Sequence, residues 1–118
     1  MKTLAPHIFR QRLLIEGHYT ASISKAKVEE FLNTLPGALN LNIYSPATVF
    51  SPEGKGKAEN QGYDGFIALI DSGISIYIWE AEKFVSIIIY TCKPFNEEQA
   101  LQFTQNFFKT DQTVTQSF

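Results

Sequence analysis

Two nucleophilic side chains stand at the ends of apolar runs. Ser72 follows Asp71 in a short polar segment between two such runs, and Cys92 ends the next one. A hydroxyl beside a carboxylate, with a thiol nearby, can supply the nucleophile and the acid of covalent catalysis. Read locally, however, Asp71-Ser72-Gly73 predicts a tight hairpin, since all three are ordinary turn residues. A lone cysteine is more often a small buried hydrophobe, so local pattern alone favours structural roles.

The other candidate groups carry weaker patterns. No motif surrounds His7 or His18, and each is expected to be a structural histidine. Tyr77, Trp79 and Tyr90 are expected to be core or interface aromatics rather than a stacking platform. A single cysteine cannot form an internal disulfide, and without a cluster of further ligands it predicts no metal site.

Mostly β-rich segments must position these groups. Residues 11–22 predict a strand, and residues 40–50 predict a second, or broken, strand. Apolar runs at 66–69, 74–79 and 84–91 predict adjacent antiparallel strands. The last run is almost continuously apolar, which indicates a central strand covered by helices on one face and by a partner on the other.

Two segments have helical periodicity. The first begins after Ser24 as N-cap and is expected to stop at Pro36-Gly37. Its apolar face, at the i, i+3, i+4, i+7 spacing, consists of Val28, Phe31, Leu32 and Leu35. The second begins after Asn96, with acidic residues in its first turn. The polar, β-prone tail 110–118 predicts an edge strand.

The segment 51–62 has almost no apolar side chain and many chain breakers, so it predicts an exposed loop. Such a loop is often a lid or binding loop, although decoration is commoner. It lacks the lysine–hydroxyl pair that a phosphate-binding loop requires. The order of elements predicts an α+β fold, a two-layer sandwich with two helices on one face of an antiparallel sheet.

Length and charge narrow the functional classes. The chain has 118 residues, which predicts a single domain over 1–118. Ten basic and twelve acidic residues give a formal charge of -2, so no nucleic-acid or membrane partner is expected. No apolar run reaches the roughly 20 residues of a membrane span, and the N-terminus has no secretory signal pattern. A cytoplasmic protein is expected.

The residues around Ser72 and Cys92, taken together, resemble the bacterial and archaeal S-adenosylmethionine decarboxylases. That family has a β-run, a Glu-Ser-His step, a strand containing Ile-His-Thr-Trp-Pro-Glu and a further strand ending in Phe-Thr-Cys. Ser72 and Cys92 fall at the family's spacing. The resemblance spans about residues 12–108, and further positions in register are Phe50, Pro52, Gly54, Ser75, Ile76, Trp79 and Thr91.

The resemblance implies a chain that cuts itself. In the family, the serine attacks the carbonyl of the preceding acidic residue, and a pyruvoyl group then caps the second chain. A mature protein of 1–71 and 72–118 is implied, with the pyruvoyl group derived from Ser72 as the cofactor for decarboxylating S-adenosylmethionine. Cys92 would reprotonate the substrate α-carbon, and Phe50 would stack on adenine. A homodimer in which sheets or sheet edges meet is also implied.

Several family positions carry other residues here. Tyr77 stands where the family has its processing histidine, and a phenol accepts a proton less readily at neutral pH than an imidazole. Asp64 stands at the second processing position and is expected to take over proton abstraction. Gly73 replaces the histidine after the cleaved serine. The ribose-binding carboxylate aligns with Ala81, beside Glu80, which is a candidate substrate contact together with Trp79.

Three functions remain open at this point. The chain can process itself and decarboxylate S-adenosylmethionine or a related amino acid in polyamine synthesis. It can instead stay intact, as an inactive homologue that binds a ligand or regulates an active relative. It can also be an interaction module built on an exposed sheet face. The altered positions all lie around the processing and substrate sites, which suits a relative that kept its fold and changed its chemistry.

Overall fold

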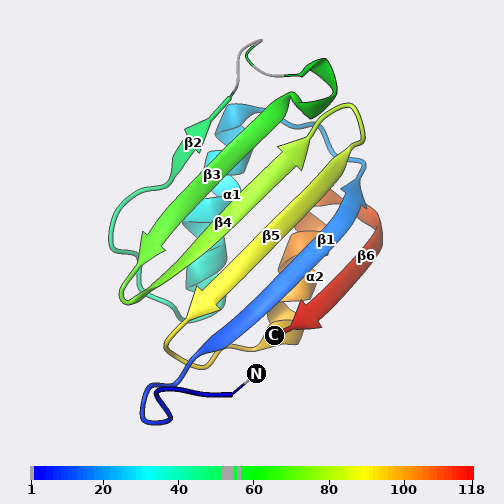
Figure 1. The fold of residues 1–118 in the computed structure, drawn as a ribbon. Helices are drawn as coiled ribbons and strands as arrows, with labels where there is room; N and C mark the ends of the chain where they lie inside the picture. The colour runs from blue at the N-terminus through cyan, green and yellow to red at the C-terminus, as the bar shows by residue number, and fades with distance from the viewer. Residues whose placement is uncertain (1, 52–54, 56) are drawn as a thin grey trace.

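Antiparallel pairing joins the strands into one sheet. The computed structural model describes residues 2–51, 55 and 57–118. The six strands follow the order β2-β3-β4-β5-β1-β6, so β4 and β5 lie at the centre (Figure 1). Their bounds are β1 Gln11–Tyr19, β2 Thr48–Phe50, β3 Gly62–Leu69, β4 Ser72–Trp79, β5 Phe84–Thr91 and β6 Thr110–Ser117. The strand predicted at 84–91 and the C-terminal edge strand are confirmed.

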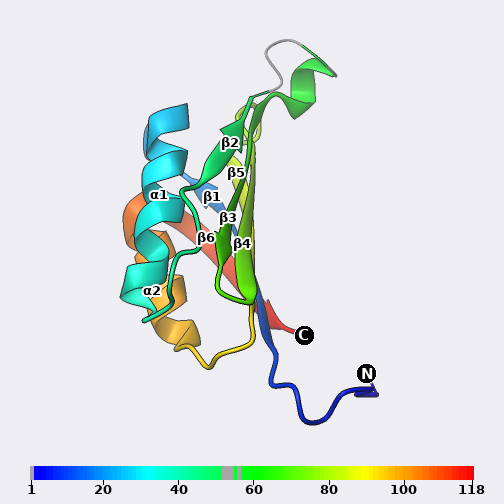
Figure 2. The same ribbon diagram turned by 90° about the vertical axis from the view of Figure 1, so that its left-hand side faces the viewer.

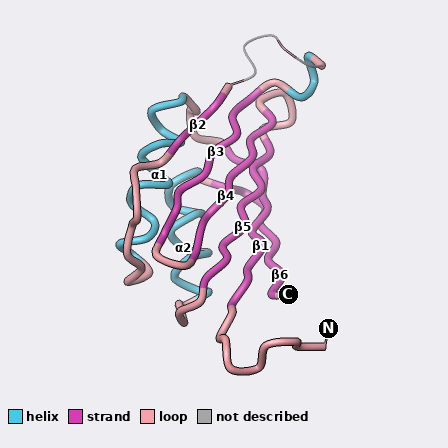
Figure 3. The backbone as a smooth tube through the Cα atoms, turned by 60° about the vertical axis from the view of Figure 1, so that its left-hand side comes forward, coloured by secondary structure: helices cyan, strands magenta, loops and turns pink. Residues whose placement is uncertain are grey.

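Both helices lie against the same face of this sheet (Figures 2 and 3). They are α1 (Lys25–Ala38) and α2 (Glu97–Phe108). The predicted α+β fold, a two-layer sandwich with two helices on one face, is therefore confirmed. We call the face that the helices cover the inner face, and the opposite one the outer face.

The core fills the space between the helices and the inner face. The sheet contributes a layer of fully buried isoleucines: Ile15, Ile67, Ile74, Ile76, Ile87 and Ile89. From α1, Phe31 is fully buried and its ring centroid lies 4.8 Å from that of Phe108 and 5.2 Å from that of Phe107. Burying such apolar surface is the main force that holds the two layers together.

The first helix is longer than the sequence indicated. Ser24 caps it as predicted, with its hydroxyl accepting the Lys27 N–H at 3.1 Å. The helix continues through Pro36 and Gly37 to Ala38, so the predicted stop is wrong. A proline in the final turn removes one hydrogen bond, and the buried position of Pro36 keeps it within the helix.

The segment 40–50 is mostly irregular. Only Thr48–Phe50 forms a strand, and Ile43 makes one isolated bridge to Leu69. Pro46 cannot donate to a ladder, and the Ala47 N–H is bound by the side chain of Asn33 instead. A continuous strand over 40–50 is therefore wrong, whereas the alternative of a broken strand agrees with the bridge at Ile43 and the short strand Thr48–Phe50.

The predicted loop at 51–62 is broken at its C-terminal end. Residues Ala58–Asn60 form one turn of 3-10 helix, and Gly62 already belongs to β3. Pro52 and Gly54, which carried part of the family resemblance, lie outside the described residues. In the C-terminal region, Asn96 caps α2 by accepting the Gln99 N–H at 2.9 Å, as predicted.

No helix covers the outer face in the described part of the chain (Figure 2). On this face of β5, Ile88 is half-buried and Tyr90 is 41% exposed, whereas Ser86 is buried and donates a hydrogen bond to Glu16. Phe66 and Phe50, on the neighbouring strands, are 47% and 64% exposed. The covering that the sequence predicted for both faces of β5 is therefore present on one face within a single chain.

A search of the described residues for a helix able to cross a membrane finds none with the required length and apolar character.

We expect Phe31→Ala to lower the free energy of unfolding by about 3–5 kcal/mol, because it removes a fully buried ring from a close-packed cluster. Urea denaturation followed by circular dichroism measures this change. The matched control is Tyr44→Ala, which truncates an aromatic side chain that is 77% exposed and should change stability by no more than about 0.5 kcal/mol. Equal losses for the two variants would contradict the assignment of the core.

Candidate functional site

Ser72 begins a strand directly after a tight turn. Leu69 pairs with Ser72 across the β3–β4 hairpin, so only Ile70 and Asp71 form the connection. The predicted hairpin is confirmed, but Ser72 and Gly73 belong to β4 rather than to the turn. Asp71 has a φ of 57°, in the left-handed region that non-glycine residues seldom occupy. The Asp71–Ser72 peptide therefore follows a strained residue at an accessible corner of the sheet.

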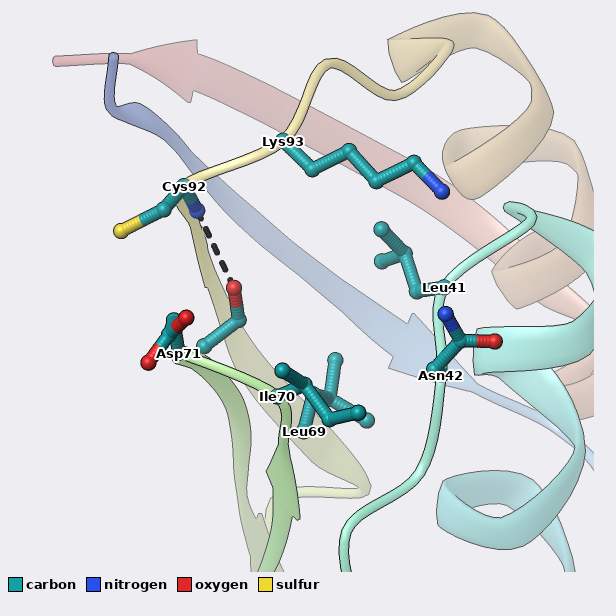
Figure 4. A pocket seen from close by; sticks show the side chains of 8 residues that line it. Leu41, Asn42, Leu69, Ile70, Asp71, Cys92 and Lys93 are labelled. Atoms are coloured by element: carbon teal, nitrogen blue, oxygen red, sulfur yellow. Dashed lines mark hydrogen bonds between the residues drawn. The ribbon is translucent and has the colours of Figure 1, made fainter. Parts of the chain in front are cut away.

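The hydroxyl of Ser72 is held by the end of the adjacent strand. Its Oγ accepts a hydrogen bond from the backbone N–H of Cys92 at 3.0 Å (Figure 4). This contact exists because β4 and β5 are neighbours, with Gly73 paired to Tyr90 in the last rung. The structure therefore brings Ser72 to the backbone of Cys92 rather than to its thiol. The Cys92 thiol itself points away from this bond (Figure 4).

Two cavities meet at the Asp71–Ser72 peptide. One, of about 210 Å³, opens between the hairpin, Cys92 and the segment after α1, and its lining includes Leu41, Asn42, Ser72 and Lys93. The other, of about 390 Å³, lies on the outer face, and Phe66 and Tyr90 form part of its wall. Asp71 and Ser72 line both, so the peptide between them is accessible from two sides.

Asp64 and Tyr77 form a second polar site on the outer face. They are directly paired across β3 and β4. Five residues along β4 separate Tyr77 from Ser72, a distance of about 17 Å at 3.4 Å per residue. Within one chain, therefore, neither side chain reaches the Asp71–Ser72 peptide. Phe50 lies beside this pair, because it is the rung partner of Asp64 on β2.

Trp79 and Glu80 lie at the far end of the same hairpin. Trp79 ends β4, and its ring centroid lies 5.5 Å from that of Phe84. Glu80 interacts electrostatically with Tyr19. Burial, and then the negative charge of Glu80, raise the pKa of the Tyr19 phenol above its usual value of 10. The structure thus brings Asp71, Ser72 and Cys92 together, and it separates them from the other two groups of predicted residues.

Comparison with known proteins identifies the family. The family model described as S-adenosylmethionine decarboxylase matches residues 17–118. The chain belongs to the S-adenosylmethionine decarboxylase family. A search of the curated proteins finds no match.

Among solved structures, the fold is similar to that of the adenosylmethionine decarboxylase from Aquifex aeolicus VF5. The TM-score is 0.74 at 17% sequence identity, over 94% of this chain and 89% of that one. The likeness therefore covers the sheet and both helices. At this identity it supports the shared fold and leaves the site to be argued from the residues themselves.

The ring of Phe66 forms part of the wall of the outer-face cavity. The same ring occupies the space beside Gly73. A Cβ at position 73 would lie 2.7 Å from two atoms of that ring, closer than packing allows. Sequence reasoning missed Phe66, because only the pairing of Ala68 with Gly73 and of Phe66 with Ser75 brings the ring there.

No three His, Cys, Asp or Glu side chains gather into a metal-binding group among residues 2–51, 55 and 57–118. The candidate site offers hydroxyl, thiol, carboxylate and ammonium groups. All four types line the first cavity, in Ser72, Cys92, Asp71 and Lys93.

We expect Gly73→Ala to lower the free energy of unfolding by no more than about 1 kcal/mol, because the new methyl group overlaps only the end of the Phe66 ring, which is 47% exposed and can shift. Thermal denaturation of this variant, of Phe66→Ala and of the double variant forms a double-mutant cycle. In a chain that already carries Phe66→Ala, the further change Gly73→Ala should lower the free energy of unfolding very little. Strict additivity of the two changes would contradict the packing of the ring over Gly73.

Proposed function

We propose that the chain cuts itself between Asp71 and Ser72 and acts as a pyruvoyl-dependent decarboxylase of S-adenosylmethionine or a related amino acid. The observation that supports this proposal is the conformation and accessibility of the Asp71–Ser72 peptide. It follows a residue with a φ of 57°, it is accessible from two cavities, and its serine hydroxyl is held at 3.0 Å by the N–H of Cys92. Family membership supports the same reaction.

The hairpin is suited to being cut. β3 and β4 are paired from Gly62–Trp79 through Leu69–Ser72, and β4 is also paired with β5. These ladders remain after the chain is opened, so the new N-terminus at position 72 stays at the edge of both cavities. A pyruvoyl group formed there would supply the electron sink for decarboxylation, and Cys92 is the candidate proton donor because it lines the same cavity.

The separation of Ser72 from Asp64 and Tyr77 supports a homodimer. About 17 Å is too far for proton transfer within one chain, whereas the outer faces of two copies can meet. A two-fold axis between those faces would set Asp64 and Tyr77 of one copy opposite Ser72 of the other. The uncovered aromatic side chains Phe50, Phe66 and Tyr90 are the apolar surface that such contact would bury. Trp79 and Glu80 would likewise reach a substrate only from the second copy.

A ligand-binding subunit that stays intact is the second candidate. It is favoured by Tyr77, whose phenol occupies the position of the family's processing histidine and is a weaker base at neutral pH. Calorimetry with S-adenosylmethionine tests this alternative on the uncut chain. Absence of any binding heat from a chain that also remains uncut would exclude both candidates.

The purified chain should separate into two species on intact-mass spectrometry, with masses corresponding to 1–71 and 72–118, the second carrying a pyruvoyl end. Ser72→Ala should abolish both species, because it removes the attacking hydroxyl. Cys92→Ala is the matched control: it keeps the backbone N–H that binds Ser72 and should still be cut, while losing decarboxylation. A single full-length mass for the unaltered chain would rule out the proposal.

Co-expression of two inactive variants should restore cutting if the second copy supplies the processing groups. One variant carries Ser72→Ala, and the other carries Asp64→Ala with Tyr77→Phe. Each alone should remain at least about 100-fold slower than the unaltered chain, as expected for loss of a general acid or base. In the mixture, only the chain that retains Ser72 should be cut, as seen by mass. Cutting by the doubly altered chain alone would show that processing occurs without these groups.

A further inference from the structure

The cavity beside Ser72 contains one cationic side chain. Among the described residues that line the two cavities at the Asp71–Ser72 peptide, Lys93 is the only cation and Asp71 the only carboxylate. The rest of the smaller cavity is neutral, with apolar walls from Leu41, Leu69 and Ile70. Lys93 itself is exposed, so its ammonium lies at the rim of this cavity and its attraction to a nearby anion is moderated by solvent.

Local structure directs the Lys93 side chain over this cavity. Lys93 follows Cys92, whose N–H binds the Ser72 hydroxyl at 3.0 Å, and it precedes Pro94, which restricts its backbone to extended conformations. Its Nζ donates to the carbonyl oxygen of Asn40 at 3.0 Å. Figure 4 shows the side chain running from the end of β5 toward Leu41 and Asn42. The Lys93 ammonium thus binds a neutral carbonyl oxygen. It can give up this hydrogen bond and bind a carboxylate instead.

Self-processing releases a new negative charge at this place. The Ser72 hydroxyl adds to the Asp71 carbonyl carbon, and the amide C–N bond breaks as the nitrogen takes the hydroxyl proton, which leaves an ester. A base then removes the Ser72 α-proton, a double bond forms between Cα and Cβ, and the Cβ–O bond breaks. Its electron pair leaves with the Asp71 carboxylate. Hydrolysis of the remaining enamine releases ammonia, and Asp71 ends with two carboxylates.

We propose that Lys93 stabilises the carboxylate that Asp71 releases, and so accelerates the elimination step of self-processing. This inference rests on the proposed function and adds to it a catalytic group outside the positions that carry the family resemblance. A cation is most useful where charge develops on a leaving group, and an ammonium–carboxylate hydrogen bond is stronger than the bond to the Asn40 carbonyl that it replaces.

The test follows the formation of the 72–118 fragment by intact mass, with and without hydroxylamine, which cleaves esters but leaves amides intact. Lys93→Met should slow fragment formation by about 5- to 10-fold, because an exposed ammonium stabilises a nearby carboxylate only modestly. Full-length chain that hydroxylamine cuts after Asp71 should accumulate, because the ester still forms while its elimination is slow. Lys93→Arg keeps the charge and should recover to within about threefold of the unaltered rate.

Lys25→Met is the matched control, since it removes an equal charge from the exposed start of α1 and should leave the rate unchanged. Thermal denaturation establishes that each variant is folded, and Lys93→Gln replaces Lys93→Met if the latter is not. Unaltered fragment formation in the Lys93 variants, or slow formation without the hydroxylamine-sensitive species, would overturn the inference while leaving the proposed function standing. A chain that never cuts itself overturns both.

Discussion

The register of the β3–β4 hairpin fixes the relative positions of Ser72, Asp64, Tyr77 and Trp79. Its two-residue turn pairs Leu69 with Ser72, and this pairing then determines that Asp64 faces Tyr77 and Gly62 faces Trp79. Side chains alternate between the two faces of a strand, so a slip of one residue would reverse all of them. The buried isoleucines at 74 and 76 oppose such a slip, because it would expose them and bury Ser75 and Tyr77. The core thus holds the site in register.

The two faces of the sheet have different roles. The inner face is closed by α1 and α2 and contains the fully buried aliphatic and aromatic side chains on which stability depends. The outer face is open in a single chain and displays aromatic, hydroxyl and carboxylate groups together. Substitutions of exposed side chains on the outer face change the free energy of unfolding little. This is consistent with a fold that is kept at 17% identity to a solved relative.

The corner at Asp71 and Ser72 combines strain with access. The left-handed backbone conformation of Asp71 is energetically unfavourable. The pairing of β3 with β4 on either side stabilises the turn enough to maintain it. The same corner adjoins the end of β5, so a backbone N–H, a thiol and an ammonium all arrive from residues 92 and 93. Two short segments far apart in the sequence therefore provide most of the groups around one peptide bond.

Much of this architecture follows from local pattern. The nearly continuous apolar run along 84–91, the caps at Ser24 and Asn96, and the apolar face of α1 determine their elements because each depends on neighbouring residues. The ends of elements were less well predicted. The sequence predicts that Pro36 stops a helix that tertiary burial continues. For 40–50 it leaves open a continuous or a broken strand, and pairing is interrupted at Pro46.

The sequence by itself determined the fold class, the hairpin at Ser72 and the spacing that relates Ser72 to Cys92. Only the tertiary structure decided which of the candidate residues share a site. It separated Asp64 and Tyr77 from Ser72 along β4, placed Phe66 over Gly73 and carried Lys93 across the cavity. The physical reason is that spacing along a chain fixes distances within one strand. Contacts between strands depend on register, and register is set by the packing of the whole core.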